Sequence, residues 1–212
     1  MIIGITGGIG SGKSTIARVL KARGFSIYDC DREAKRIITE NAVVRKAIVD
    51  LLGKEAFMPS PKAPFTGVYN TAYVAQHVFE EPQLLERLNA IVHPAVKEDI
   101  QNHPFFSKGD GDKILVIESA ILFDAGLDAL CDKIIVVDAP EEIRIARTIA
   151  RDYKGDASHA NVNKVRARIE AQKGRYNIGL TSEASRTLVI QNDGEIPIEE
   201  NVEKITQWMC KN

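Results

Sequence analysis

The 212-residue sequence is poor in the residues that support disulfide, zinc or membrane-spanning structure. Its three cysteines, Cys30, Cys131 and Cys210, are far apart and form no C-x-x-C pair, and its four histidines lack ligand spacing. We therefore expect neither disulfides nor structural zinc. The longest apolar runs are only as long as a strand, and no basic segment opens the chain, which predicts neither a membrane span nor a signal peptide. These absences favour a cytoplasmic protein.

Aromatic residues make up only 6% of the chain, and the formal net charge is −1. Proteins that bind nucleic acids usually combine a basic surface with aromatic side chains that stack on bases. The composition therefore argues against nucleic acid as a partner. The length suits one well-buried core with smaller insertions.

What the chain does contain is a phosphate-binding motif at its start. Residues 7–15 have the sequence G-G-I-G-S-G-K-S-T, which fits G-x-x-x-x-G-K-[ST] and follows an apolar run typical of a buried strand. Glycines leave the backbone free to wrap an anion, and the helix that follows adds its positive end. A plain strand-to-helix turn would need neither the lysine nor the hydroxyl. The motif therefore predicts binding of ATP or GTP.

The motif also assigns roles to its residues. Lys13 is expected to supply charge at the β- and γ-phosphates, and Ser14 to join the coordination shell of Mg²⁺. The residues expected to bind the nucleotide are Gly8, Gly10, Ser11, Gly12, Lys13, Ser14 and Thr15.

Alternating strands and helices predict an α/β fold of the P-loop NTPase or kinase type, with a doubly wound parallel sheet flanked by helices. Short β-rich runs predict strands over residues 2–6, 25–28, 114–117, 134–138 and 188–190. Residues 32–52 and the stretch after residue 71 have helical periodicity, whereas three prolines within residues 58–67 favour a loop or an insertion. A turn-rich break is expected over residues 108–112. The predicted parts are a core of residues 1–30, 110–140 and 181–212, a mostly helical insertion of residues 31–109 without strands, and a lid of residues 141–180.

The predicted lid carries nine basic and five acidic residues. Arg147 and Arg151 are four residues apart on an expected helix, so they share a face and could close over a polyphosphate. A solvated charged face is the alternative for such a segment.

The second predicted strand ends at a pair of aspartates, Asp29 and Asp31. Ligands of open α/β sheets bind at the carboxyl ends of strands, so Asp31 is a candidate base for an acceptor hydroxyl. An aspartate before a helix also serves as an N-cap, and the spacing does not separate the two roles.

Together these motifs resemble the dephospho-CoA kinase family. The resemblance rests on residues 6–15, D-C-D at 29–31, L-N-A-I-V-H-P at 88–94, L-F-D at 122–124 and R-x-x-x-R-D at 147–152. It implies ATP-dependent phosphorylation of the ribose 3′-hydroxyl of dephospho-CoA, the last step of coenzyme A synthesis. It also implies a core, a helical substrate-binding insertion and a lid.

The resemblance implies roles for single residues as well. Asp31 would be the catalytic base, Arg147 a lid residue at the nucleotide phosphates, and Asn192 a neighbour of the adenine. Thr6 and His93 would lie near the substrate, although a histidine before a proline is also explained as a polar contact that ends a helix.

The chain departs from the family pattern in three places. Residues 120–124 are A-I-L-F-D where the family has P-L-L-F-E, the segment after Asp152 is longer than usual, and residues 184–192 lack the aspartate of A-D-x-V-I-x-N. The first departure concerns the role of Asp124 and the second the shape of the lid, whereas in the third Asn192 remains.

Three other functions fit parts of the sequence. Another small-molecule kinase would share the fold and the loop, because neither selects the acceptor. A GTPase would need N-K-x-D, and the nearest match, residues 163–166, ends in a cation, Arg166. A nucleic-acid-binding ATPase would suit the basic lid segment but not the composition of the rest. The oligomeric state is not specified by the sequence.

Overall fold

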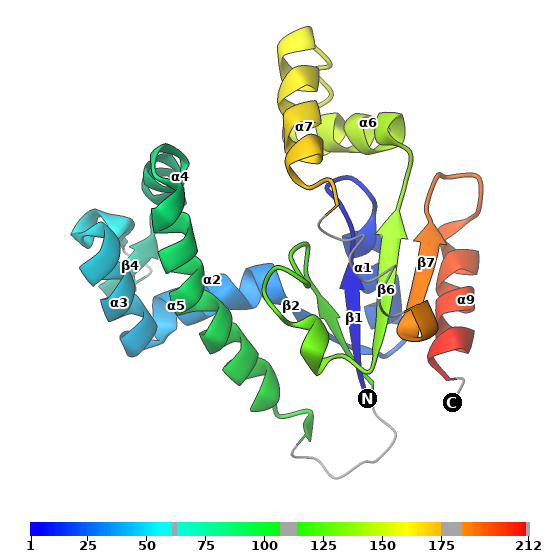
Figure 1. Ribbon diagram of the computed structural model, residues 1–212, viewed down its shortest axis with the longest axis horizontal. Coiled ribbons are helices and arrows are strands. Elements are labelled where there is room, and N and C mark those ends of the chain that lie inside the picture. The colour runs from blue at the N-terminus through cyan, green and yellow to red at the C-terminus, as the bar shows by residue number, and fades with distance from the viewer. Residues whose placement is uncertain (61–62, 107–113, 175–183, 211–212) are drawn as a thin grey trace. The chain divides into compact units, whose positions relative to one another are not determined.

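The computed structural model describes residues 1–60, 63–106, 114–174 and 184–210 (Figure 1). The predicted turn over residues 108–112 and the end of the predicted lid, residues 175–180, lie outside them. The chain forms two compact units, one of Met1–Tyr28 with Asp110–Asn212 and one of Asp29–Gly109.

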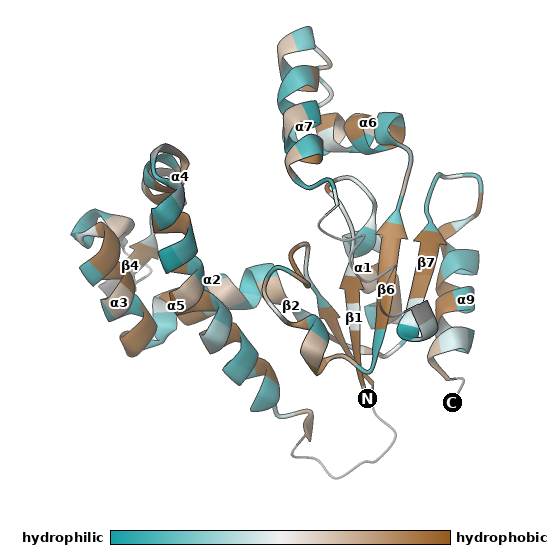
Figure 2. Ribbon diagram, in the orientation of Figure 1, coloured by the Kyte–Doolittle hydropathy of each residue, from teal (hydrophilic) through white to brown (hydrophobic). Residues whose placement is uncertain are grey.

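The first unit is built on a five-stranded sheet with the order β2-β5-β1-β6-β7. The strands are β1 (Ile2–Thr6), β2 (Ser26–Asp29), β5 (Leu115–Glu118), β6 (Lys133–Asp138) and β7 (Thr187–Gln191). The neighbours β1–β5, β1–β6 and β6–β7 pair in parallel. Figure 2 shows these strands as predominantly hydrophobic, as expected for a sheet covered on both faces. The predicted parallel α/β fold is therefore confirmed.

Helices α1 (Lys13–Ala22) and α9 (Ile198–Met209) pack against this sheet. Their buried side chains, among them Leu20 and Ile205, join Ile3, Ile5 and Val137 of the strands in one core. Between β6 and β7 the chain forms α6 (Glu141–Asp152) and α7 (His159–Ala171), followed by a short 3₁₀ turn, η4 (Ala184–Arg186). A second such turn, η3 (Asp128–Leu130), precedes β6. No helix in the described part of the chain is long and apolar enough to cross a membrane.

The second unit is mostly helical. It contains α2 (Cys30–Glu40), α3 (Ala42–Leu52), α4 (Thr71–Glu80), α5 (Pro82–Gln101) and the 3₁₀ turn η1 (Lys54–Ala56). The prediction of one helix over residues 32–52 is wrong, because Asn41 divides it. Asn41 has an extended backbone, and its side chain accepts hydrogen bonds from Val43 N at 3.0 Å and Val44 N at 3.1 Å. It therefore ends α2 and caps α3.

The expectation that this unit has no strands is also wrong. Strands β3 (Phe57–Ser60) and β4 (Ala63–Tyr69) form an antiparallel hairpin. The register shifts between Met58 and Ser60, and Pro59 lies at that irregularity. Each strand of a two-stranded sheet is an edge strand, so a residue without an N–H is tolerated there. The prolines that indicated a loop are thus compatible with a hairpin.

Candidate functional site

The phosphate loop occupies residues 7–12, between the buried strand β1 and the helix α1. Gly10 and Gly12 have positive φ angles of 77° and 95°, which favour glycine. A Cβ at Gly10 would lie 2.8 Å from Thr148 Oγ1, and one at Gly12 would collide with the Asn192 side-chain amide. The loop therefore takes a backbone path that only glycine permits at these two positions.

Two hydroxyl groups, one at the end of β1 and one in the loop, lack partners among the described residues. Thr6 is 1% and Ser11 0% exposed, yet Thr6 Oγ1 and Ser11 Oγ make no hydrogen bond there. Because buried polar groups are nearly always satisfied, two such atoms at the loop indicate a site that a polar ligand completes. Thr6, predicted as a substrate contact, closes β1 at this point.

The first turn of α1 carries Lys13 and Ser14, whose backbone N–H groups precede the intrahelical hydrogen bonds. The Ser14 hydroxyl donates a hydrogen bond to Glu118 Oε1. Glu118 closes β5, and it pairs in register with Ile5 of the neighbouring β1. This arrangement places a carboxylate and a hydroxyl together beside the phosphate loop.

Glu118 was not identified from the sequence. Its one signal there is its place directly after a predicted buried strand. Only the pairing of β5 with β1 brings it to Ser14.

Arg147 and Asn192 contact the backbone of the loop at Ser11. Arg147 Nη1 donates to Asn192 O at 2.8 Å and to Ser11 O at 3.4 Å, while Asn192 Nδ2 donates to Ser11 O at 2.7 Å. Asn192 is 4% exposed. The Asn192 side chain thus supports the loop backbone, and the predicted contact of these residues with nucleotide stays a prediction.

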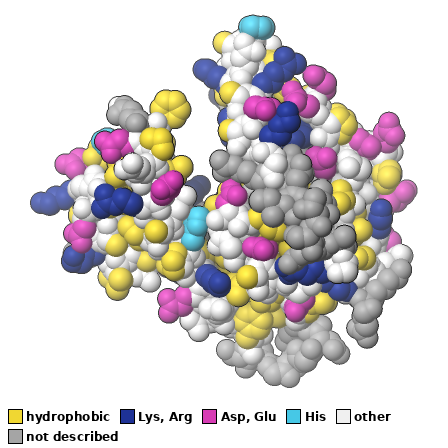
Figure 3. Space-filling view, viewed as in Figure 1, with side chains coloured by type: hydrophobic (Ala, Val, Ile, Leu, Met, Phe, Trp, Pro, Cys, Tyr) yellow, Lys and Arg dark blue, Asp and Glu magenta, His cyan; other side chains and the backbone are white. Residues whose placement is uncertain are grey.

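Helices α6 and α7 lie beyond the carboxyl end of β6 (Figure 1). Asp152, at the end of α6, pairs with Arg151 at 2.6 Å and with Arg168 of α7 at 2.9 Å. The hydrogen bond from Arg151, followed by that from Arg168, outweighs the effect of burial and lowers the pKa of Asp152 from 3.8 to about 2. Figure 3 shows side chains of both charges over these helices. The structure therefore joins α6 to α7 through Asp152 and Arg168, and it holds the Arg151 guanidinium on the same carboxylate.

In the second unit, Asp29 and Asp31 have different environments. Asp29 is the N-cap of α2, since its Oδ1 accepts from Arg32 N at 3.0 Å. The alternative that Asp31 is the cap is therefore wrong. Asp31 is exposed in the first turn of α2, and among the described residues its carboxylate has no hydrogen bond or ion pair. It is accessible to a ligand hydroxyl.

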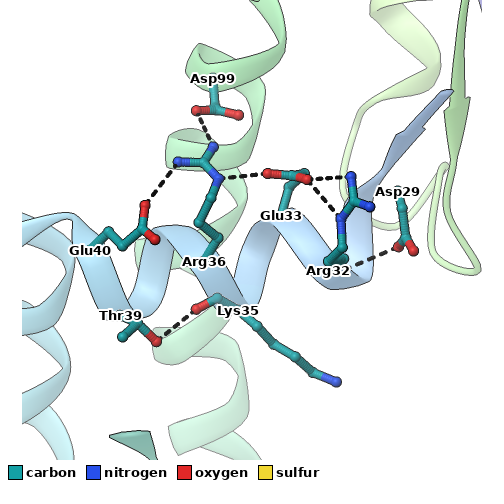
Figure 4. A network of polar contacts seen from close by, with 8 residues as sticks. All are labelled: Asp29, Arg32, Glu33, Lys35, Arg36, Thr39, Glu40 and Asp99. Carbon is teal, nitrogen blue, oxygen red and sulfur yellow. Dashed lines mark hydrogen bonds and ion pairs between the residues drawn. The ribbon is translucent and has the colours of Figure 1, made fainter. Parts of the chain in front are cut away.

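A network of charges holds α2 to α5 beside this turn (Figure 4). Arg36 donates to Glu33 at 2.6 Å and to Asp99 of α5 at 2.7 Å, and Arg32 also contacts Glu33, at 2.7 Å. Burial opposes the charge of Glu33, but the hydrogen bonds from Arg36 and Arg32 outweigh it and lower the pKa of Glu33. Through Arg36 the network fixes the middle of α2 on α5.

His93 lies within α5, which continues through Pro94 to Gln101. The alternative that His93 ends a helix is therefore wrong. His93 is half-buried, and its proximity to substrate stays a prediction. Asp124, in the irregular segment after β5, is exposed.

The structure therefore brings the predicted nucleotide residues together within the first unit and adds Glu118 to them. Asp31 and His93 belong to the second unit.

Comparison with known proteins identifies close relatives of this chain. The family model described as "CoaE: Dephospho-CoA kinase" matches residues 1–197. The dephospho-CoA kinase of Porphyromonas gingivalis is 43% identical over 150 residues, covering 71% of this chain and 69% of the relative. That of Salinibacter ruber is 38% identical over 194 residues, covering 92% of this chain and 89% of the relative. Among solved structures, TT1252 from Thermus thermophilus aligns with a TM-score of 0.76 at 26% identity, covering 100% of this chain and 98% of that one.

Proposed function

This chain belongs to the dephospho-CoA kinase family, and we propose that its phosphate loop, Glu118 and Asp31 carry out the reaction of that family. The reaction is the ATP-dependent phosphorylation of the ribose 3′-hydroxyl of dephospho-CoA, which gives coenzyme A and ADP. The acceptor is a small molecule, and we expect the reaction to take place in the cytoplasm.

The donor half of the site is the phosphate loop with the start of α1. Backbone N–H groups of the loop and the N-terminus of α1 would hold the β- and γ-phosphates of ATP, and Lys13 would add a positive charge to them. The unpartnered hydroxyls of Thr6 and Ser11 support a polar ligand here. Arg147, held against Ser11 O and Asn192 O, would meet the nucleotide from the lid.

The contact between Ser14 and Glu118 fits a magnesium ion. Both groups offer oxygen, the ligand type that Mg²⁺ prefers, and Mg²⁺ in such sites keeps waters and phosphate oxygens as its other ligands. A bound Mg²⁺ would neutralise charge between the β- and γ-oxygens during transfer. Ser14 would be a direct ligand, and Glu118 would hold it or a coordinated water.

Asp31 would act on the acceptor. Because Asp29 caps α2, the carboxylate of Asp31 is left available to accept or orient the proton of the 3′-hydroxyl. The hydroxyl oxygen attacks the γ-phosphorus, the bond from phosphorus to the bridging oxygen breaks, and ADP leaves with that oxygen. His93 is a candidate contact for the same substrate.

The observation that carries this proposal is the match of the family model over residues 1–197. The test measures ADP release from ATP and Mg²⁺ with dephospho-CoA, adenosine, AMP, shikimate or no acceptor, together with the mass of the product. A product heavier by one phosphoryl group with dephospho-CoA alone would support the proposal. Transfer to another acceptor, or hydrolysis without one, would refute it.

A further inference from the structure

Ile9, in the middle of the phosphate loop, is attached to the lid helices in three ways. Its side chain, 8% exposed, belongs to an apolar cluster with Ile145 and Ile149 of α6 and Val165 and Ile169 of α7. This cluster is separate from the core of the sheet. The loop is thus packed against the base of the lid rather than only against the strands.

Both backbone polar groups of Ile9 are also held by lid side chains. Ile9 N donates to Gln172 Oε1 at 2.8 Å, and Arg144 Nε donates to Ile9 O at 2.9 Å. Gln172 directly follows α7, and Arg144 lies on α6 and is 5% exposed. Neither contact is local, since the partners are 163 and 135 residues away in the sequence.

The next residue shows how closely the loop follows α6. A Cβ at Gly10 would lie 2.8 Å from Arg144 Cα, so no larger residue fits between the loop and the helix. The Ile9 N–H donates to Gln172, so it is already satisfied without an anion. The loop would therefore bind phosphate through its later N–H groups, and Ile9 would fix their position.

We propose that Gln172 is a positioning residue for nucleotide binding, which fixes the phosphate loop through the Ile9 amide and couples the affinity for nucleotide to helices α6 and α7. This inference rests on the proposed use of the loop for ATP. It requires no particular acceptor.

The coupling has a physical basis in the cost of an unsatisfied buried amide. Without the Gln172 oxygen, Ile9 N must find another partner, and the loop shifts or becomes mobile. Ordering the loop again on binding then reduces the affinity. Because one such hydrogen bond corresponds to roughly tenfold in an equilibrium constant, we expect a tenfold effect.

The test compares Gln172→Met, which keeps the length but lacks the acceptor, with Gln172→Glu, which keeps an acceptor oxygen. Gln207→Met, at an exposed position of α9, is the matched control. The measurements are the Kd for ADP by calorimetry, hydrogen exchange of the Ile9 amide by NMR, and the melting temperature.

In Gln172→Met we expect a Kd for ADP raised about tenfold and faster exchange at Ile9, with a melting temperature that still lies well above the temperature of the binding assay. Gln172→Glu should keep the Ile9 amide protected, and Gln207→Met should change neither quantity. A Kd within about twofold of the unaltered protein, despite fast exchange at Ile9, would overturn the proposal.

Should Gln172→Met not fold, hydrogen exchange in the unaltered protein still tests the proposal. Slow exchange of its Ile9 amide without nucleotide supports the proposal, and fast exchange refutes it. Because the readout is ADP binding rather than turnover, failure of the acceptor assay would refute the proposed function and leave this result standing.

Discussion

The close approach of Asn192 to Gly12 predicts a large effect for Gly12→Ala. Two penalties add. An alanine at a φ of 95° is strained by about 1–2 kcal/mol, and its Cβ would displace the Asn192 amide from Ser11 O. Loss of that buried 2.7 Å hydrogen bond adds about 1–3 kcal/mol.

Gly24 provides a matched control at the other end of α1. Its φ is 93°, and it follows the helix with Gly24 N donating to Lys21 O at 3.0 Å and Phe25 N to Leu20 O at 3.1 Å. Among the described residues, a Cβ at Gly24 would meet no atom within 4 Å. Gly24→Ala therefore carries the backbone strain without the collision.

The assay is denaturant-induced unfolding of the nucleotide-free variants, with the Kd for ADP measured by calorimetry. We expect the free energy of unfolding to fall by about 2–5 kcal/mol in Gly12→Ala and by about 1–2 kcal/mol in Gly24→Ala. The Kd for ADP should rise at least about tenfold in the first and stay within about twofold in the second. Equal losses of stability, with equal Kd values, would refute the argument that Asn192 and Gly12 shape the loop together.

Three further predictions concern the proposed chemistry and the contact between α6 and α7. Asp31→Asn should lower kcat by roughly two to four orders of magnitude and leave the KM for ATP largely unchanged, whereas the exposed Asp50→Asn of α3 should change neither; near-normal turnover would remove Asp31 from the role of base. Glu118→Gln should raise the half-saturating Mg²⁺ concentration by roughly 10–100-fold in the kinase assay, and an unchanged value would contradict its place at the metal. Because the pKa of Asp152 is lowered to about 2 in the folded protein, its ion pairs should contribute stability at and above about pH 4 and lose it as the pH falls through about 2. The melting temperature of the unaltered protein should therefore exceed that of Asp152→Asn at pH 6, and the difference should vanish towards pH 2; a constant difference would contradict this.

The strands of the sheet were predictable because a parallel sheet covered on both faces selects continuous apolar, β-branched runs. The helices and strands of the second unit were less predictable. Helical periodicity continues across Asn41, so the break is visible only in its side-chain contacts. At residues 57–69, the prolines predicted a loop where the structure has a hairpin. Proline is excluded from central strands, but a two-stranded hairpin has only edge strands.

In the candidate site, too, the residues of a consecutive motif were predictable, whereas those brought together by tertiary contacts were not. The phosphate loop carries its signature in consecutive residues, whereas Glu118 is one carboxylate with no motif of its own. Glu118 reaches the site only because β5 lies beside β1. Gln172 gave no signal either, because its partner is a backbone amide 163 residues away.

The residues of the phosphate loop are therefore consecutive in the sequence, but its conformation also depends on residues far away in the sequence. Its motif supplies glycines that permit its path, and distant residues determine which path it takes. Asn192 and Arg147 hold Ser11 O, and Gln172 and Arg144 hold the two backbone groups of Ile9. Substitutions at Asn192, Arg144 or Gln172 should consequently act as changes to the nucleotide site even where the motif is intact.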